Sequence, residues 1–563
     1  AGSEGTRGAG SEITVTLSAS FEFDGFAEFE ISIAVPSHQG AGAGAILLED
    51  VCLEIPIRAG IAKLASGLGQ AGGSLERYLQ PFVKGFPADG TRREGTHGAG
   101  TEWVWSWDEE PNALSRRTGL NGRLWLGSGS TGVQISMAPP AGFDPAAVLS
   151  SPVESTCDDD GPRKGAKCTR MAEEQYAAAL GSAKWRNGGR GSVRVSRRML
   201  PTAGTDGKTQ EAVVVSISTG RLELVPGGAP IRLPFRLLLT PVRSPPLRAP
   251  VRSRHFHMQR FVSVEAAAMH VPGGTIIIHQ GHELNPYINY PFKRTEQLAE
   301  YVRRAHKAGM RVKLYYTTRE LSSAASELWA LRSLGSEAII PGERGGHPWL
   351  QEHLRSGYNA EWHEKLSDGN IDASISTAAF ASRLDSYWLE GIAWLVKTVG
   401  IDGIYLDGAP YERRTLHRLR RIVDAVHPNF ELDLHASCAA NPRLPYAEIF
   451  GVLDSIWFGE QCEYGKMAPD EWLADVSGAP YGLPAEVLTD EAARWAALVF
   501  GMTCRVYPEP NRCKPQPLWN ALTAMGASDA VLIGFWDERP LVGVRARRVG
   551  FKESARGGHG GDA

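Results

Sequence analysis

The sequence lacks long apolar runs and has no marked excess of one charge. No stretch of about 18 consecutive apolar residues occurs, so a membrane-spanning helix is not expected. The 60 basic and 63 acidic residues leave a formal net charge of -3, which argues against a general nucleic-acid binder. Apolar residues at 42% and charged residues at 22% are ordinary for a folded globular chain. The composition therefore predicts a globular protein without a membrane span and without a nucleic-acid partner.

Cysteine is scarce. Seven cysteines in 563 residues cannot form a disulfide scaffold, and no CxxC pair offers a zinc site. Cys157 and Cys168 bracket a hydrophilic segment and would close a small loop in a secreted protein, whereas free thiols are the alternative. The compartment stays open on this basis, with an extracellular or secretory location favoured.

The common nucleotide and serine-hydrolase motifs are also missing. No GxGxxG links an expected strand to an expected helix, and neither a P-loop lysine motif nor a GxSxG elbow is present. These absences count against nucleotide-dependent enzymes and serine hydrolases of the common types. No cofactor is predicted.

Length and residue patterns predict more than one domain, because compact domains usually hold about 100 to 200 residues. Residues 1–245 contain many short alternating segments without helices between them, which is typical of an antiparallel β-sandwich, and an insertion at about 139–183 interrupts them. Four prolines and four arginines within 241–254 indicate a linker, placed at 246–256. Residues 257–537 form the second predicted domain, and the glycine-rich residues 538–563 are expected to be a disordered tail.

The second domain alternates between strand and helix patterns. Helical spacing is clear at 294–309 and from Phe380 to Gly400, and it recurs from Leu416 until Pro428. Short apolar strands stand between these helices, and they include the segments TIIIHQG, RVKLYYT, IDGIYLD, FELDLHAS, LDSIWFGE, TCRVY and VLIGFWD. Seven or eight strands of this kind predict a (β/α)8 barrel, with an open doubly wound sheet as the alternative.

Tryptophan is frequent in the first domain. These side chains could stack on sugar rings, but core packing is the favoured interpretation because large buried aromatics dominate cores. The tryptophans concerned are Trp103, Trp105, Trp107, Trp125 and Trp185.

Carboxylates follow several expected strands of the second domain. Asp407 ends the strand of IDGIYLD, Glu460 follows Trp457 and Phe458, and Glu486 follows a Gly-Leu-Pro turn. In a barrel the carboxyl ends of the strands meet at one mouth, so these groups are candidates for paired acid and base catalysis. Glycoside hydrolysis needs such a pair, with one group protonated and one ionised. The apolar neighbours of Glu460 predict the acid role for it and the ionised role for Asp407, with Glu486 in reserve for either.

Other side chains near the strand ends are expected to bind substrate. Glu320, Tyr316, Asp433, His435 and Trp457 lie at or beside these ends. A long segment between two barrel strands also carries His347 and Trp349, and its aromatic and polar composition suits a lid over a sugar.

A metal centre is the weaker alternative. His279 and His282 with Glu283, or Asp433 with His435, have ligand-type side chains, but neither group has a recognised metal-binding spacing. No metal is therefore predicted, and the histidines are expected to hydrogen-bond substrate or backbone.

Several motifs resemble those of glycoside hydrolase family 123-like proteins. They include YYTTRELS, GHPWLQEHL, WLVKTVGIDGIYLDG and VSGAPYGLPAEVL in the second domain, and RLWLGSGSTGVQISM with WRNGGRGSV in the first. The resemblance covers about residues 10–537 and implies an N-terminal β-sandwich before a barrel.

The resemblance also implies an exo-acting β-N-acetylgalactosaminidase that uses substrate assistance. In that mechanism one carboxylate orients the substrate acetamido group, whose oxygen attacks the anomeric carbon, and a second carboxyl group protonates the leaving oxygen. The family uses an adjacent Asp-Glu pair, whereas Asp407 is followed here by Gly408. Double displacement through Asp407 therefore stays open.

The sequence thus predicts a glycoside hydrolase that degrades a poly- or oligosaccharide. Two other classes stay open at this point. One is a catalytically silent carbohydrate-binding protein with the same folds, and the other is a metal-dependent enzyme acting on acidic polysaccharide.

Overall fold

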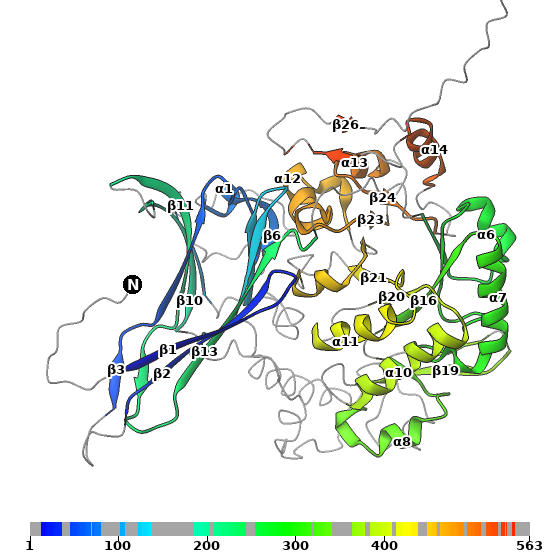
Figure 1. The fold of residues 1–563 in the computed structure, drawn as a ribbon, viewed down its shortest axis with the longest axis horizontal. Helices are drawn as coiled ribbons and strands as arrows, with labels where there is room; N and C mark the ends of the chain where they lie inside the picture. Colours follow the sequence, from blue (N-terminus) through cyan, green and yellow to red (C-terminus); the bar gives the residue numbers. More distant parts are fainter. Residues whose placement is uncertain are drawn as a thin grey trace, which may run out of the picture.

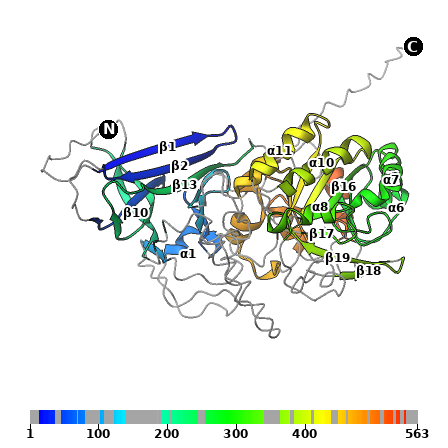
Figure 2. The same cartoon turned by 90° about the horizontal axis from the view of Figure 1, so that it is seen from below.

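The protein consists of two packed units, an antiparallel β-sandwich and a parallel barrel with helices around it (Figure 1). A second view shows the sandwich and the barrel side by side along the long axis (Figure 2). The computed structural model describes residues 13–36, 45–68, 70–79, 102–106, 122–137, 185, 187, 190–202, 207–243, 254–317, 320–339, 363–366, 368–377, 383–407, 413–436, 447–458, 462–488, 493–507, 514–526, 531–534, 536 and 543–545.

The sandwich contains two main antiparallel sheets. The larger has the order β1-β2-β13-β9-β8-β5-β6 and the smaller the order β4-β11-β10-β7. The strands of the larger sheet are β1 (Thr14–Phe21), β2 (Phe26–Ala34), β5 (Leu64–Gly67), β6 (Gln70–Ser74), β8 (Arg123–Gly127), β9 (Gly132–Ser136) and β13 (Ile231–Thr240). Those of the smaller sheet are β4 (Cys52–Arg58), β7 (Glu102–Ser106), β10 (Ser192–Pro201) and β11 (Thr209–Ser218). A short pair, β3 (Ile46–Leu48) with β12 (Leu222–Leu224), and the helix α1 (Leu75–Leu79) complete the unit.

Tryptophans fill the space between the two sheets. Trp103, Trp105 and Trp185 belong to one buried cluster with apolar residues from both sheets. Trp125 is 2% exposed, and its indole N–H donates to Thr240 Oγ1 over 3.0 Å. Packing in the sandwich core is therefore confirmed for Trp103, Trp105 and Trp185, whereas Trp125 packs on Tyr481 of the barrel unit at 5.2 Å. Trp107 lies outside the described residues. Residues 139–183 of the predicted insertion do so too.

Eight parallel strands form the second unit, in the order β14-β15-β16-β20-β21-β22-β23-β24. The sheet closes on itself, because the His257 N–H donates to the Val506 carbonyl over 2.8 Å and the Val506 N–H to the His255 carbonyl over 2.9 Å. The predicted barrel is thereby confirmed over the open sheet. Its strands are β14 (His255–Met258), β15 (Thr275–Ile278), β16 (Arg311–Thr317), β20 (Gly403–Asp407), β21 (Glu431–Ala436), β22 (Ser455–Phe458), β23 (Ala485–Val487) and β24 (Thr503–Cys504).

Helices cover the outside of the barrel. The three helices expected from periodicity are present as α7 (Thr295–Lys307), α10 (Arg383–Thr398) and α11 (Arg413–Asp424). α10 ends before Gly400, whose φ of 83° places it in the left-handed region that favours glycine. The others are α6 (Val264–His270), α13 (Ala493–Val499) and α14 (Gln516–Ala524), with short segments α12 (Pro469–Glu471), η5 (Pro291–Arg294), η7 (Ala447–Val452), η8 (Tyr464–Lys466), the π-helical η9 (Trp472–Val476) and η10 (Ala479–Tyr481). None of the described helices has the length and apolar composition needed to cross a bilayer.

Two strand assignments differ from the sequence-based prediction. The segment VLIGFWD forms β25 (Val531–Ile533), which pairs antiparallel with β26 (Gly543–Arg545) instead of joining the barrel. The missing barrel strand is β14, which begins at His255 inside the predicted linker. β14 alternates histidine with Phe256 and Met258, so it lacks the continuous apolar run of a buried parallel strand. β26 falls within the predicted tail.

The long segment after β16 folds into a small unit of its own. β17 (Glu320–Ser322), β19 (Ile371–Ser376) and β18 (His363–Lys365) make a three-stranded antiparallel sheet. α8 (Leu328–Arg332) and η6 (Gly335–Glu337) follow β17, and Leu321, Leu328 and Ile375 share a separate apolar cluster.

The sandwich and the barrel unit are joined by a buried carboxylate. Asp475, in η9 of the barrel unit, is fully buried and accepts hydrogen bonds from Ser66 Oγ and the Gly72 N–H of the sandwich, both over 2.6 Å. Arg123 of β8 also donates to Glu448 Oε1 over 2.6 Å. Charged contacts of this kind fix one relative placement, because a buried polar group without its partner is costly.

We expect Asp475→Ala to lower the free energy of unfolding by about 2–4 kcal/mol, because Ser66 and Gly72 would lose a buried acceptor. Urea unfolding followed by tryptophan fluorescence measures the change. The control is Glu463→Gln, which breaks the exposed pair with Lys466 and should cost less than about 1 kcal/mol. Equal effects of the two variants would contradict this role for Asp475.

Candidate active site

Asp407 lies at the carboxyl end of β20, where its carboxylate is held by two neighbouring strands. The Tyr315 hydroxyl of β16 donates to Oδ2 and the His435 Nδ1–H of β21 donates to Oδ1, each over 2.5 Å. β16 and β21 are the two strands that flank β20. His435 follows Leu434, the partner of Leu406, and is level with Asp407, whereas Tyr315 is opposite Tyr405 and its long side chain reaches up to the carboxylate. The Asp407 side chain remains 31% exposed and the group can meet a ligand.

The surroundings keep Asp407 ionised. Burial alone would raise its pKa, but the charge and hydrogen bond of His435 and the hydrogen bond from Tyr315 outweigh burial and lower the pKa to about 2. A carboxyl group with this pKa carries no proton at ordinary pH. Asp407 is therefore suited to stabilising positive charge or to accepting a hydrogen bond, and it is unsuited to donating a proton.

Aromatic rings form a layer inside the barrel beneath Asp407. The Tyr405 and Trp457 rings are 5.7 Å apart, and the His257 ring lies 5.3 Å from Tyr405 and 5.2 Å from Trp457. His435 packs 5.0 Å from Trp457, and His279 lies 4.0 Å from Tyr315. Burial lowers the pKa of His257 well below its ordinary value, so its ring is neutral.

This aromatic layer contains polar atoms that have no hydrogen-bond partner within the described part of the chain. They are the Tyr405 hydroxyl, the Trp457 indole nitrogen and Nδ1 of His257. Buried polar atoms are nearly always paired in folded proteins. Tyr405, Trp457 and His257 are at most 2% exposed, so the layer forms a packed floor beneath the barrel mouth.

A buried ion-pair network supports the aromatic layer. The Arg505 guanidinium of the β24 segment donates to Asp433 Oδ2 over 2.9 Å and to Glu486 Oε2 over 2.7 Å, and all three side chains are at most 2% exposed. The same guanidinium lies 4.5 Å from the centre of the Trp457 ring. Burial opposes the charge of both carboxylates, yet Arg505, with Lys313 and His255, lowers the pKa of Asp433, and His255 and Arg505 lower that of Glu486.

Several predicted site residues therefore lie away from Asp407. Glu486 and Asp433 are inside the barrel in the Arg505 network, where they pair with a cation instead of facing the mouth. Tyr316 points to the outside of the barrel and packs on Trp388 at 6.4 Å, so its neighbour Tyr315 takes the expected place. Glu320 is 8% exposed and accepts from Ser374 Oγ of the small sheet over 3.1 Å.

The structure brings Asp407, His435 and Trp457 together, as the strand-end reasoning predicted. Glu460, His347 and Trp349 lie outside the described residues, and their roles stay predictions. Side-chain alternation in β16 could have distinguished Tyr315 from Tyr316, because successive residues of a strand point to opposite faces of the sheet. The arginine within the apolar run TCRVY was a second missed signal, because a buried arginine requires carboxylate partners.

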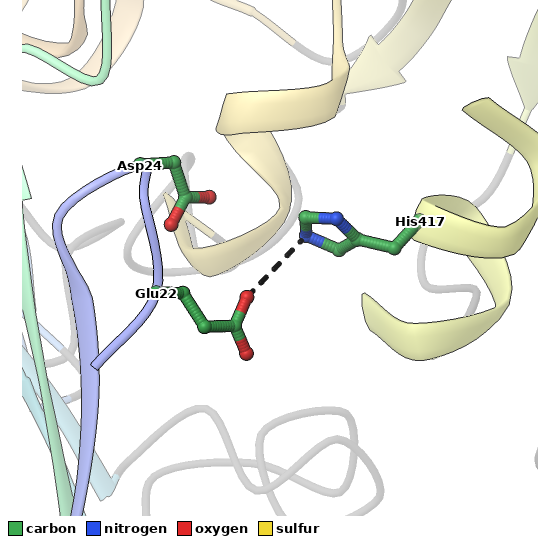
Figure 3. Close-up of side chains that lie close together, drawn as sticks. All are labelled: Glu22, Asp24 and His417. Atoms are coloured by element: carbon green, nitrogen blue, oxygen red, sulfur yellow. Dashed lines mark ion pairs between the residues drawn. The ribbon is translucent and has the colours of Figure 1, made fainter. Parts of the chain in front are cut away.

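One group of described residues has the side chains and spacing of a metal site, and it lies at the domain interface. Glu22 and Asp24, from the turn between β1 and β2, face His417 on α11 (Figure 3). Arg413 already donates to both carboxylates, over 2.6 Å to Glu22 and 2.7 Å to Asp24. Its guanidinium supplies the positive charge that a metal would bring, so we interpret the group as an interdomain ion pair.

The two metal-binding alternatives from the sequence also find other partners. Asp433 is bonded to Arg505, and His435 to Asp407. The Leu284 N–H donates to Nδ1 of His282 over 3.3 Å, and burial lowers the pKa of His282 to about 4.

Comparison with protein families decides the classification. The description "Glycoside hydrolase 123, TIM-barrel domain" matches residues 248–507, and "Glycoside hydrolase 123, third domain" matches residues 3–140. The chain belongs to glycoside hydrolase family 123. It is therefore an enzyme that cleaves glycosidic bonds, and the Asp407 mouth is the candidate active site of this hydrolase.

No curated protein matches this glycoside hydrolase. Among solved structures, α-N-acetylgalactosaminidase NagBb from Bifidobacterium bifidum, as a quadruple mutant, is 10% identical with a TM-score of 0.37, covering 92% of this chain and 86% of that one. The galactosidase domain of the α-galactosidase-sucrose kinase AgaSK is 10% identical with a TM-score of 0.40, covering 92% and 67%. At these scores neither likeness carries an argument about substrate.

Tyr315→Phe should move the acidic limb of kcat/KM upward by roughly one pH unit. The lost hydrogen bond to a charged group is worth about 1.5 kcal/mol, and 1.36 kcal/mol corresponds to one unit of pKa. The pKa of Asp407 would rise from about 2 toward its ordinary 3.8, so the ionised form would be lost at higher pH than in the wild type.

Tyr316→Phe is the matched control, because its hydroxyl lies on the other side of the same strand. A pH-rate profile on one aryl glycoside compares the three proteins. The assignment is wrong if Tyr316→Phe shifts the acidic limb as much as Tyr315→Phe.

Glu486→Gln should lower the free energy of unfolding by about 3 kcal/mol, because it removes one of the two carboxylates paired with buried Arg505. The folded pKa of Glu486 lies below 4.5, so its stabilisation is present above about pH 4.5 and is lost as the pH falls. The variant should therefore lose this acid-sensitive part of its stability. Urea unfolding at pH 7 and pH 4 provides the measurement, with the exposed-pair variant Glu300→Gln as control. A fully stable but inactive Glu486→Gln would favour the catalytic role instead.

Proposed function

We propose that this hydrolase is an exo-acting β-N-acetylhexosaminidase, with N-acetylgalactosamine as the favoured sugar, and that it works by substrate assistance. The observation that carries the proposal is the state of Asp407, an ionised carboxylate with both oxygens already hydrogen-bonded at the barrel mouth. The family membership supports the sugar, and the residues of the mouth support the division of roles.

The low pKa of Asp407 favours an orienting role over a nucleophilic one. Two donors stabilise its negative charge and lower its basicity, which makes attack on an anomeric carbon less favourable. Each carboxylate oxygen still has a second lone pair to accept a hydrogen bond. The acetamido N–H of a substrate can use that lone pair, and the hydrogen bond pushes electron density toward the acetamido oxygen.

In the proposed reaction the acetamido oxygen attacks the anomeric carbon and the glycosidic C–O bond breaks. The leaving oxygen takes a proton from Glu460, and the positive charge on the resulting oxazolinium ring is stabilised by Asp407. Water then attacks the anomeric carbon, gives its proton to Glu460 and opens the ring. Glu460 follows Trp457 and Phe458 in the sequence, and apolar neighbours favour the protonated form that this role requires.

The aromatic layer beneath Asp407 supports the mouth from inside the barrel. Trp457 and Tyr405 are buried, and both pack against His435, which holds Asp407. The layer thereby fixes the orientation of the carboxylate that would meet the acetamido group.

Asp407→Asn and Glu460→Gln should each lower kcat/KM on an aryl N-acetyl-β-galactosaminide by about 10²–10⁴-fold, because each removes a group that acts on the transition state. Release of the aryl group measures turnover. Glu463→Gln is a matched control on an exposed surface glutamate and should keep wild-type activity.

The substrate set separates the mechanisms. Turnover confined to sugars that carry the acetamido group, together with competitive inhibition by a thiazoline analogue of the cyclic intermediate, supports substrate assistance. Equal turnover of the corresponding galactoside, which lacks that group, would reject it and leave double displacement through Asp407.

A further inference from the structure

A cavity lies at the end of the barrel opposite Asp407, between the barrel and the sandwich. It has a volume of about 680 Å³ and is lined by residues of both units. Arg311 and Glu431, the first residues of β16 and β21, are in its wall, whereas Asp407 is the last residue of β20. Ligand pockets typically measure about 300–1,000 Å³ and are common at domain interfaces.

The cavity wall carries a balanced set of charges. Arg420 pairs with Asp454 and Asp424, Arg243 donates to Asp454 over 3.1 Å, and Arg311 pairs with Glu431. The ion pairs hold the guanidinium and carboxylate groups of the wall in fixed orientations. Binding a ligand therefore costs little side-chain entropy. The walls still reach solvent, with 39% of the Arg243 side chain and 26% of the Asp454 side chain exposed.

This balance indicates which ligands suit the cavity. Each arginine of the wall already faces a carboxylate, so little positive charge is left to attract an anion. A dense, fixed array of donors and acceptors without net charge matches a neutral ligand with many hydroxyl groups.

An exposed aromatic ring stands at the edge of the cavity. Phe23 occupies the turn between β1 and β2 and is 91% exposed, and its ring approaches His417 edge-on at 6.1 Å. Figure 3 shows the residues on either side of it, Glu22 and Asp24, facing His417 across the interface. Arg413 fastens this turn to α11 and lies 4.2 Å from the Phe26 ring, so the turn that carries Phe23 is anchored at its base.

We propose that this cavity is a second, non-catalytic glycan site, which binds a neutral oligosaccharide by stacking one sugar on Phe23 and hydrogen-bonding others to the ion-paired wall. The proposal rests on the glycosidase activity of the family and not on the sugar or the mechanism suggested above. A polymer held here stays near the enzyme between cleavage events, while small substrates reach the barrel mouth without using the site.

Affinity electrophoresis tests the site without any need for turnover. Asp407→Asn is run in gels that contain either a neutral galactan or chondroitin sulfate, alone and combined with Phe23→Ala or Phe261→Ala. Phe261 is another exposed phenylalanine, 45% exposed and on the barrel, and it is the matched control. Phe23→Ala should weaken retardation by the neutral galactan about three- to tenfold, the effect of losing one aromatic stacking contact, and Phe261→Ala should not.

A second variant, Asp424→Ala, removes an exposed acceptor of the wall and should weaken retardation in the same direction. With catalytically active protein, Phe23→Ala should keep wild-type kcat/KM on a small aryl glycoside. Unchanged retardation of Phe23→Ala overturns the site, and stronger retention by chondroitin sulfate that depends on Phe23 overturns the neutral ligand class. If the wild type does not cleave the aryl N-acetyl-β-galactosaminide, the specificity proposed above is rejected. The gel result does not depend on that outcome.

Discussion

The interior of the barrel depends on Arg505. This cation is completely buried, so it is tolerable only while Asp433 and Glu486 remain ionised beside it. The guanidinium of Arg505 also lies 4.5 Å from the centre of the Trp457 ring and 5.4 Å from that of Tyr405. The charge network and the aromatic layer are therefore in direct contact. Lys313, His255 and Glu431 extend the network toward the start of the strands. A rigid charged base thus fixes the rings that lie beneath Asp407.

The two ends of the barrel use the same residue types for different purposes. Deep inside, Asp433 and Glu486 pair with Arg505 and have almost no access to solvent. At the mouth, Asp407 is held by neutral or titratable donors, Tyr315 and His435, and keeps an exposed fraction. A strong cation directly on Asp407 would neutralise the charge that a developing positive centre needs. The choice of partner therefore separates the structural carboxylates from the one that can act on a substrate.

Much of the architecture could be predicted from local patterns. Helical periodicity located α7, α10 and α11, and the abrupt end of the strand in IDGIYLD identified Asp407. β14 was not predicted as a strand, because its inward positions are His255 and His257. These histidines interrupt the apolar pattern that is typical of a parallel strand. Glu486 looked like a mouth residue because it follows a Gly-Leu-Pro turn, whereas it lies in the middle of β23 and faces Arg505 of the neighbouring β24 segment.

Cysteine chemistry shows the same limit. Cys462 and Cys504 are each part of a disulfide bond and Cys52 is a free, exposed thiol, yet spacing alone had drawn attention only to Cys157 and Cys168. Cys504 ends β24 within the core of the barrel unit, a position that an isolated cysteine in an apolar run does not reveal. Disulfide partners are set by tertiary contact, which local patterns do not encode.

The Asp475 contact makes the two units of this protein a poor target for modular exchange. A barrel without its sandwich would expose the Asp475 carboxylate to water. Asp475 would also lose its hydrogen bonds from the Ser66 hydroxyl and the Gly72 backbone N–H. The sandwich has matching demands, since a side chain at Gly72 would collide with that same carboxylate. A chimera with a sandwich from another enzyme would need both small residues at these places. We therefore expect the sandwich and the barrel to be inherited together when related genes recombine.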